Sequence, residues 1–257
     1  MPTRLDAVVV DAADPPRLAA FWARALGWAV THDAPEEASV GVTDAPAWGD
    51  GGAPAVVFTR VEEPKSVKNR VHLELASGNR ADQLATVSRL LDLGASRADI
   101  GQEEAPWVVL ADPEGNEFCV LDARETHRDV GPLAAVVVDC ADSVDLANFW
   151  MRATGWPVLR YSERFAALRH PSASTTWWEL IEVPEPKTGR NRLRPDLAPR
   201  PGSDVPTEVA RLERLGARHL DDGRGGGSSV AMADPEGNEF CVRPPRRRPH
   251  APTGRRR

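Results

Sequence analysis

The chain has 257 residues, of which 41% are hydrophobic and 27% charged, and its formal net charge is −6. This composition is typical of a globular protein with a buried core, and the length suits one large domain or two smaller ones. No segment approaches the roughly 20 apolar residues of a membrane helix, and the acidic body argues against specific nucleic-acid binding. Three cysteines are too few for a disulfide framework, so we expect a cytoplasmic protein.

The first predicted elements are a strand, a helix and three short strands. Valine-rich "LDAVVVDA" (5–12) favours a strand, and Asp14 followed by Pro15 marks a helix start. Gly27 ends this helix. One apolar helix face is formed by Leu18, Phe21, Trp22, Ala25 and Leu26. Three short strands are expected at about 29–32, 38–43 and 54–61.

The same order of elements then begins again. "VHLELA" (71–76) predicts a strand, and residues 80–93 predict a helix that Gly94 stops. Its inward positions are expected to be Leu84, Val87, Leu90 and Leu91. "WVVLA" and "EFCVLD" predict two strands, joined by the turn sequence "DPEGN". The elements expected up to residue 61 therefore form one β-α-β-β-β module, and those from residue 71 onward form a second.

The whole arrangement occurs twice. "ADPEGNEFCV" stands at 111–120 and again at 233–242, and residues 5–28 match residues 133–156. A repeat of this length indicates two copies of a domain and four modules in an α+β protein. The first copy carries an insertion, "DAPAWGDGGAP", that predicts a surface loop. We divide the chain into copies at 1–122 and 133–243, a linker at 123–132 and a disordered basic tail at 244–257.

The motifs "FW…LGW", "VHLEL" and "ADPEGNEFCVL" together resemble the vicinal oxygen chelate superfamily, and more closely its glyoxalase-like domains, here in tandem. The resemblance implies that the two modules of a copy curl into one cup that holds a ligand. It also implies that metal-dependent members carry ligands on the first and last strand of each module. Those positions hold Ala7, Thr59, His72 and Cys119 in the first copy, and Ala135, Ile181, Arg194 and Cys241 in the second.

These positions supply two possible metal ligands in the first copy and one thiol beside a cation in the second. A zinc or iron site needs three or four converging ligands, so we expect no metal and no other cofactor. The superfamily includes isomerases, dioxygenases, lyases and non-catalytic binders, so the resemblance leaves the reaction open.

Alternation along the strands selects further candidate residues. Glu74 should share a face with His72, and the pair could act as acid and base; the alternative is a hydrogen-bonded histidine in a polar cleft. Glu117 and Cys119 should face the same way. Their counterparts in the second copy are Arg194, Asp196, Glu239 and Cys241. An arginine there suits an anionic ligand group, although a plain Arg–Asp or Arg–Glu pair explains it equally.

Tryptophans could supply an aromatic wall for a flat ligand. Trp107, Trp177 and Trp178 lie on predicted strands, and we assign Trp107 and Trp178 to the ligand site. Trp22 and Trp150 lie on helices and are expected in the core. The cysteines at 119 and 241 are expected to be small buried residues.

The leading hypothesis is a metal-independent small-molecule binder of the resistance or sequestration type, as a monomer or a homodimer. The competing hypothesis is a lyase or isomerase that uses His72 and Glu74 as acid–base groups, with or without a metal. A third is that one copy is purely structural. Motifs of nucleotide-binding loops, zinc proteases and serine hydrolases do not occur.

Overall fold

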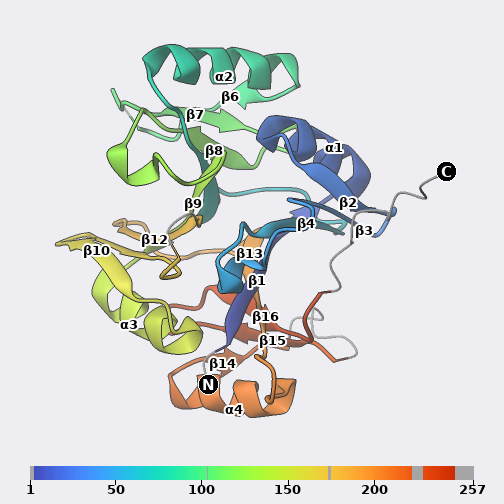
Figure 1. The fold of residues 1–257 in the computed structure, drawn as a ribbon, viewed down its shortest axis with the longest axis vertical. Coiled ribbons are helices and arrows are strands. Elements are labelled where there is room, and N and C mark those ends of the chain that lie inside the picture. The colour runs from blue at the N-terminus through green and yellow to red at the C-terminus, as the bar shows by residue number, and fades with distance from the viewer. Residues whose placement is uncertain (1–2, 103, 173–174, 222–227, 247–257) are drawn as a thin grey trace.

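In the computed structural model, the described residues form two eight-stranded sheets with four α-helices (Figure 1). The structure describes residues 3–102, 104–172, 175–221 and 228–246. The expected α+β class and the four β-α-β-β-β modules are confirmed. None of the helices in these ranges combines the length and hydrophobicity that crossing a bilayer requires.

The first copy contains two modules. Module 1 comprises β1 (Arg4–Ala12), α1 (Pro15–Leu26), β2 (Ala29–Asp33), β3 (Glu37–Gly41), the short 3-10 helix η1 (Trp48–Asp50) and β4 (Ala55–Arg60). Module 2 comprises β5 (Val71–Leu75), α2 (Arg80–Asp92), β6 (Ser96–Arg97), β7 (Val108–Ala111) and β8 (Glu117–Val120).

The second copy repeats this order after the 3-10 helix η2 (Glu125–His127) of the linker. Module 3 comprises β9 (Leu133–Cys140), α3 (Ser143–Thr154), β10 (Val158–Ser162), β11 (Phe165–Leu168) and β12 (Trp177–Glu182). Module 4 comprises β13 (Leu193–Ala198), α4 (Val205–Arg214), β14 (Arg218–His219), β15 (Val230–Ala233) and β16 (Glu239–Val242).

The ends of α1 follow from the residues that mark them in the sequence. The Asp14 side chain accepts a hydrogen bond from the backbone N–H of Arg17, which satisfies one of the free donors of the first turn. Gly27 closes the helix at φ 67°, a left-handed conformation that favours glycine. In the second copy Asp142 and Gly155 cap α3 in the same way.

The sheets combine modules from different copies. Sheet A runs β14-β15-β16-β13-β1-β4-β3-β2 and joins modules 1 and 4. Sheet B runs β10-β11-β12-β9-β5-β8-β7-β6 and joins modules 2 and 3. The strand pairs that join the copies are the antiparallel pairs β1–β13 and β5–β9. The expectation that the two modules of one copy share a cup is therefore wrong. Each copy supplies one strand of the β1 and β9 kind and one of the β5 and β13 kind, so the repeat alone is compatible with pairing within a copy or between copies.

Within a copy, the two modules meet through their helix-covered faces. The Trp22 ring of α1 lies edge-on to Phe118 of β8 at 5.0 Å, and its Nε1 donates to Asp112 Oδ2 at 3.2 Å. Glu114 accepts hydrogen bonds from the backbone N–H groups of Ala13 and Asp14 at 2.7 and 2.9 Å. The repeated decapeptide thus does more than form a hairpin, because it also ties the second module of a copy to the start of the first helix.

One hydrophobic core runs through both copies. Trp22 and Trp150 belong to it, as expected, whereas Leu84 of α2 is 51% exposed and does not. The insertion of the first copy also contributes, because Trp48 is fully buried and its Nε1 donates to the Thr176 carbonyl at 3.1 Å. Its ring lies 5.5 Å from that of Trp156 in the second copy. The insertion is therefore a docking segment and not merely a surface loop.

The linker and the start of the tail both pack against a sheet. His127 and Val130 of the linker are buried on sheet B. Residues 244–246 of the tail lie against sheet A, where Arg246 makes three hydrogen bonds. The expectation of disorder is therefore wrong for these three residues, because acidic side chains hold them in place. The remainder of the tail, 247–257, lies outside the described residues.

Candidate functional site

In the part of the chain that the structure describes, each sheet has one face covered by α-helices and one face without them. The helix-free face of sheet A carries Ala7 and Val9 of β1, with Asp196 and Arg194 opposite them on β13. The helix-free face of sheet B carries Ala135 and Val137 of β9, with Glu74 and His72 opposite them on β5. We call these two faces cup A and cup B.

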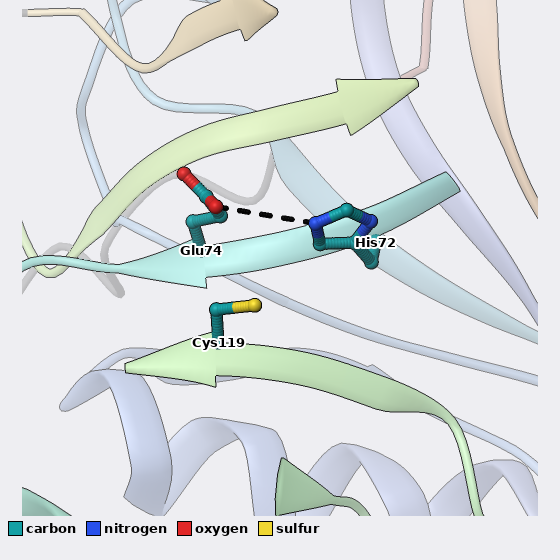
Figure 2. A group of neighbouring side chains, drawn as sticks. All are labelled: His72, Glu74 and Cys119. Atoms are coloured by element: carbon teal, nitrogen blue, oxygen red, sulfur yellow. Dashed lines mark ion pairs between the residues drawn. The ribbon is translucent and has the colours of Figure 1, made fainter. Parts of the chain in front are cut away.

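Cup B brings together three side chains of module 2. His72 and Glu74 project from β5 and Cys119 from β8, toward one point (Figure 2). One donor atom from each residue lies within 4.8 Å of the other two, and His72 Nε2 is 3.9 Å from Glu74 Oε1. The predicted common face of these residues is confirmed, because Glu74 stands directly beside Cys119 in the strand register.

Burial keeps this cluster uncharged near neutral pH. Loss of hydration lowers the pKa of His72 below its usual value, so its imidazole is neutral. The same effect, with the nearby Glu179 carboxylate, raises the pKa of Glu74 to about 8. Burial also raises the pKa of the Cys119 thiol. A neutral imidazole beside a protonated carboxyl group is a base beside an acid, which is what moving a proton between two atoms of a ligand requires.

The same donors also fit a metal ion. An imidazole nitrogen, a carboxylate oxygen and a thiolate are zinc ligands, and catalytic zinc sites use three protein ligands with one open position. Glu74 Oε2 is buried without a hydrogen-bond partner, so it is available as a donor atom. The count of two ligands made from the sequence is therefore wrong, because Glu74 was not included. A metal bound here supplies Lewis-acid chemistry.

A second polar pair, which is not expected from the sequence, lies on the other side of cup B. His127 Nε2 of the linker lies 3.4 Å from Glu179 Oε1 of β12, and both side chains are 3% exposed. The guanidinium of Arg160 is 3.7 Å from the same carboxylate oxygen. The alternation of β12 marks Glu179 as a cup residue, but no local signal shows that the linker enters the cup.

Cup B is largely filled by its own side chains. Trp177 packs across it, with Arg169 over its ring at 4.1 Å, and its Nε1 donates to the Thr126 carbonyl of the linker at 3.2 Å. Val130 adds apolar contact. The linker thus lies over the cup, and the exposed fraction of the His72 side chain is only 15%.

Cup A holds a cavity of about 700 Å³. Its floor is made of small residues, among them Ser39 and Gly41 of β3 and Ala55 and Val57 of β4. In the register of sheet B, the counterparts of Ala55 and Val57 are Trp177 and Glu179. The difference in side-chain volume explains why one cup is open and the other is filled. Polar groups on the cavity wall come from Asp6, Thr31, His32, Glu37 and Asp44.

A family model described as "Glyoxalase-like domain" matches residues 7–121 and 135–243. The chain belongs to the glyoxalase-like domain family. No curated protein matches its sequence. The expected resemblance agrees with this match.

Solved structures show the same fold at low sequence identity. Glyoxalase I from Zea mays matches with a TM-score of 0.65 and 16% identity, over 94% of this chain and 92% of that one. A putative dioxygenase from Bacillus subtilis matches with a TM-score of 0.57 and 11% identity, over 95% and 86%. At these identities the likeness concerns the glyoxalase-like fold alone.

The remaining predicted site residues of this glyoxalase-like chain fall into three groups. Arg194 forms a buried ion pair with Asp11 at 2.6 Å, which is the Arg–Asp alternative considered from the sequence, although the partner lies in the other copy. Asp196 accepts hydrogen bonds from Arg243 and Arg246 at 3.3 and 3.0 Å. Cys241 is buried beside them in cup A.

Glu117 and Glu239 hold loops of the glyoxalase-like modules. Glu117 accepts from Lys65 Nζ at 2.6 Å and from the Asn69 backbone N–H at 3.2 Å. Glu239 makes the equivalent bonds to Lys187 and Asn191 at 2.9 and 3.2 Å. The local geometry therefore explains both carboxylates without a ligand.

The two tryptophans assigned to the ligand site lie in different places. Trp107 borders cup B, where Arg124 stands 5.8 Å from its ring centre. Trp178 does not line a cup, because it is 1% exposed in the helix-side core beside Trp150. The residue of this pair that faces a cup is Trp177. The strand alternates as predicted, but its start was not known to within one residue, and an error of one residue reverses the face.

Proposed function

We propose that this glyoxalase-like protein binds a small molecule in cup A without the help of a metal ion. The observation that carries the proposal is the cavity of about 700 Å³ on the face that carries the ligand in the resemblance to the superfamily. Pockets of about 300–1,000 Å³ with a few polar groups are typical of small-molecule sites. This volume suits a ligand the size of a metabolite or an antibiotic.

The donor set of cup A supports metal-independent binding. The family's ligand positions there hold Ala7, Thr59, Arg194 and Cys241. Alanine and arginine do not coordinate metals, and Arg194 places a permanent positive charge beside the thiol. Among the described residues, the His72, Glu74 and Cys119 group in cup B is the only set of three clustered donors.

A screen of purified protein against metabolites and aromatic antibiotics, by thermal shift with and without a chelator, tests the proposal. A ligand that binds in cup A should raise the melting temperature equally in both conditions. A free ligand concentration of about 100 times the Kd adds roughly 2.7 kcal/mol to the free energy of unfolding, and such a screen detects a change of this size readily. A stabilising effect that disappears with chelator contradicts metal independence.

A second candidate function is acid–base chemistry of the lyase or isomerase type in cup B. The observation that favours it is the neutral His72 3.9 Å from the protonated Glu74, whose carboxyl oxygen Oε2 has no hydrogen-bond partner. In this function His72 accepts a proton from the substrate and Glu74 returns one. The linker would have to move for a substrate to enter. Loss of turnover in both His72→Ala and Glu74→Gln, with ligand binding to cup A unchanged, would support this candidate.

A further inference from the structure

The segment after the last strand enters a cup in both copies. At the offset of 122 residues that relates the copies here, Leu121–Arg124 corresponds to Arg243–Arg246. In cup B, Arg124 lies near enough to Glu74 to lower the pKa of that carboxyl group, although burial outweighs this effect. In cup A, Arg246 binds Asp196, the counterpart of Glu74. The two segments are thus equivalent parts of the fold.

The contacts of Arg246 join it to both modules of sheet A. Its backbone N–H donates to Asp6 Oδ2 at 3.1 Å on β1, and its Nη1 donates to Glu37 Oε1 at 2.9 Å on β3. Its Nη2 donates to Asp196 Oδ2 at 3.0 Å on β13. Asp6 and Asp196 are 4% and 2% exposed, so these charge-assisted bonds are shielded from water on one side.

The two segments differ in how they are held. The linker is continuous with a strand at each end, and it closes cup B with His127 and Val130. The segment 243–246 follows β16, and it lines the cup A cavity without filling it. Ion pairs of Arg243 and Arg246 join this segment to sheet A, so it can move away from the cavity wall when those pairs break.

We propose that residues 243–246 form a strap that restricts access to the cup A cavity, with Arg246 as its latch. Release of Arg246 from Asp6, Glu37 and Asp196 opens the cavity wall that this segment provides. The proposal presupposes the cavity described above as the ligand site, but it concerns access to the cavity and is measured without any ligand.

Access is measured by labelling a cysteine placed in the cavity. Ser39 lines the floor, and the native cysteines at 119, 140 and 241 are at most 5% exposed. In full-length Ser39→Cys protein, the rate of reaction with iodoacetamide therefore reports access to cup A. Mass spectrometry measures the labelled fraction of the peptide that contains residue 39, so slow labelling of other cysteines does not interfere.

Removing the latch should speed the reaction severalfold. Arg246→Ala in the Ser39→Cys background is the test variant, and Arg97→Ala, an exposed arginine on β6 of the other sheet, is the matched control. Equal rates for Arg246→Ala and its parent would overturn the strap, and so would an equal acceleration by Arg97→Ala. Far-UV circular dichroism and the melting temperature show whether each variant keeps the fold.

Salt provides a second test that needs no change at Arg246. Ions weaken partly exposed pairs, and the Arg246 side chain is 16% exposed. Raising sodium chloride from about 0.05 M to about 0.5 M shortens the Debye length about threefold and should speed labelling of the parent, but not of Arg246→Ala. A salt effect of the same size in both proteins contradicts the latch. Failure of the ligand screen leaves these rates unchanged, so the strap and the proposed function fail separately.

Discussion

Arg194 Nη1 lies 2.6 Å from Asp11 Oδ1, and both side chains are 7% exposed. The pair joins β13 of the second copy to β1 of the first, so it ties the copies together inside cup A. Removal of Arg194 takes a buried counter-charge away from the Asp11 carboxylate. Arg194→Ala should therefore lower the free energy of unfolding by about 3–5 kcal/mol. Chemical denaturation measures this directly.

A double replacement distinguishes the pair from the packing of the arginine side chain. Arg194→Met with Asp11→Leu removes both charges and should cost less than Arg194→Ala alone, because no unpaired charge remains. If the double variant is less stable than the single one, the arginine contributes mainly through its own packing.

The second prediction concerns a fragment of residues 1–125. Alone, it would leave β1 without β13 and β5 without β9, so two sheet edges would be unpaired. Two fragments can satisfy both edges by pairing β1 of one with β5 of the other. The fragment should therefore be a dimer that loses structure on dilution, as followed by sedimentation and circular dichroism. A stable folded monomer would show that the cross-copy pairing is not required.

The third prediction concerns pH. The pKa of Glu74 is raised from 4.5 to about 8 in the folded state, so the folded protein holds a proton that the unfolded chain releases above about pH 4.5. The contribution of the buried Glu74 carboxyl group to the free energy of unfolding is complete below about pH 4.5. It is lost at about 1.4 kcal/mol per pH unit as the pH rises from there toward 8. Glu74→Gln should remove this slope. Chemical denaturation between about pH 4.5 and pH 8 measures this slope. The same pH dependence of the free energy of unfolding in the wild type and in Glu74→Gln would contradict the raised pKa of Glu74.

Much of the fold follows from local sequence signals, and the pairing of modules does not. Asp14, Pro15 and Gly27 mark the ends of α1 because capping depends on neighbouring residues. The pairing of β1 with β13 depends on contacts nearly 190 residues apart, which no local pattern encodes. Trp48 was assigned to a surface loop for the same reason, since its partners lie in the other copy.

The candidate site was predicted where strand alternation was sufficient. His72, Glu74 and Cys119 share a face, as their spacing requires. The cavity of cup A was not predicted, because it depends on the absence of bulk at Gly41, Ala55 and other small residues. Small residues are common in any strand. They indicate a cavity only when they lie side by side across a sheet.

The fourth prediction concerns metal. The His72, Glu74 and Cys119 group should bind zinc when it is supplied, with release of the protons held by the carboxyl group and the thiol. Calorimetry in buffers of different ionisation enthalpy measures those protons. His72→Ala should weaken zinc binding, whereas His219→Ala, on exposed β14, should not. Equal zinc affinity in both variants would place the metal elsewhere.

The central claim is that cup A is the ligand site, and filling its cavity tests this most directly. Gly41→Phe is suitable because an added Cβ meets no atom closer than 3.9 Å, so the side chain can extend into the cavity. Gly131→Phe, in open space on the linker, is the matched control. Isothermal titration of a ligand found by screening should show binding lost in Gly41→Phe and unchanged in Gly131→Phe. Undiminished affinity in a folded Gly41→Phe protein would contradict the claim.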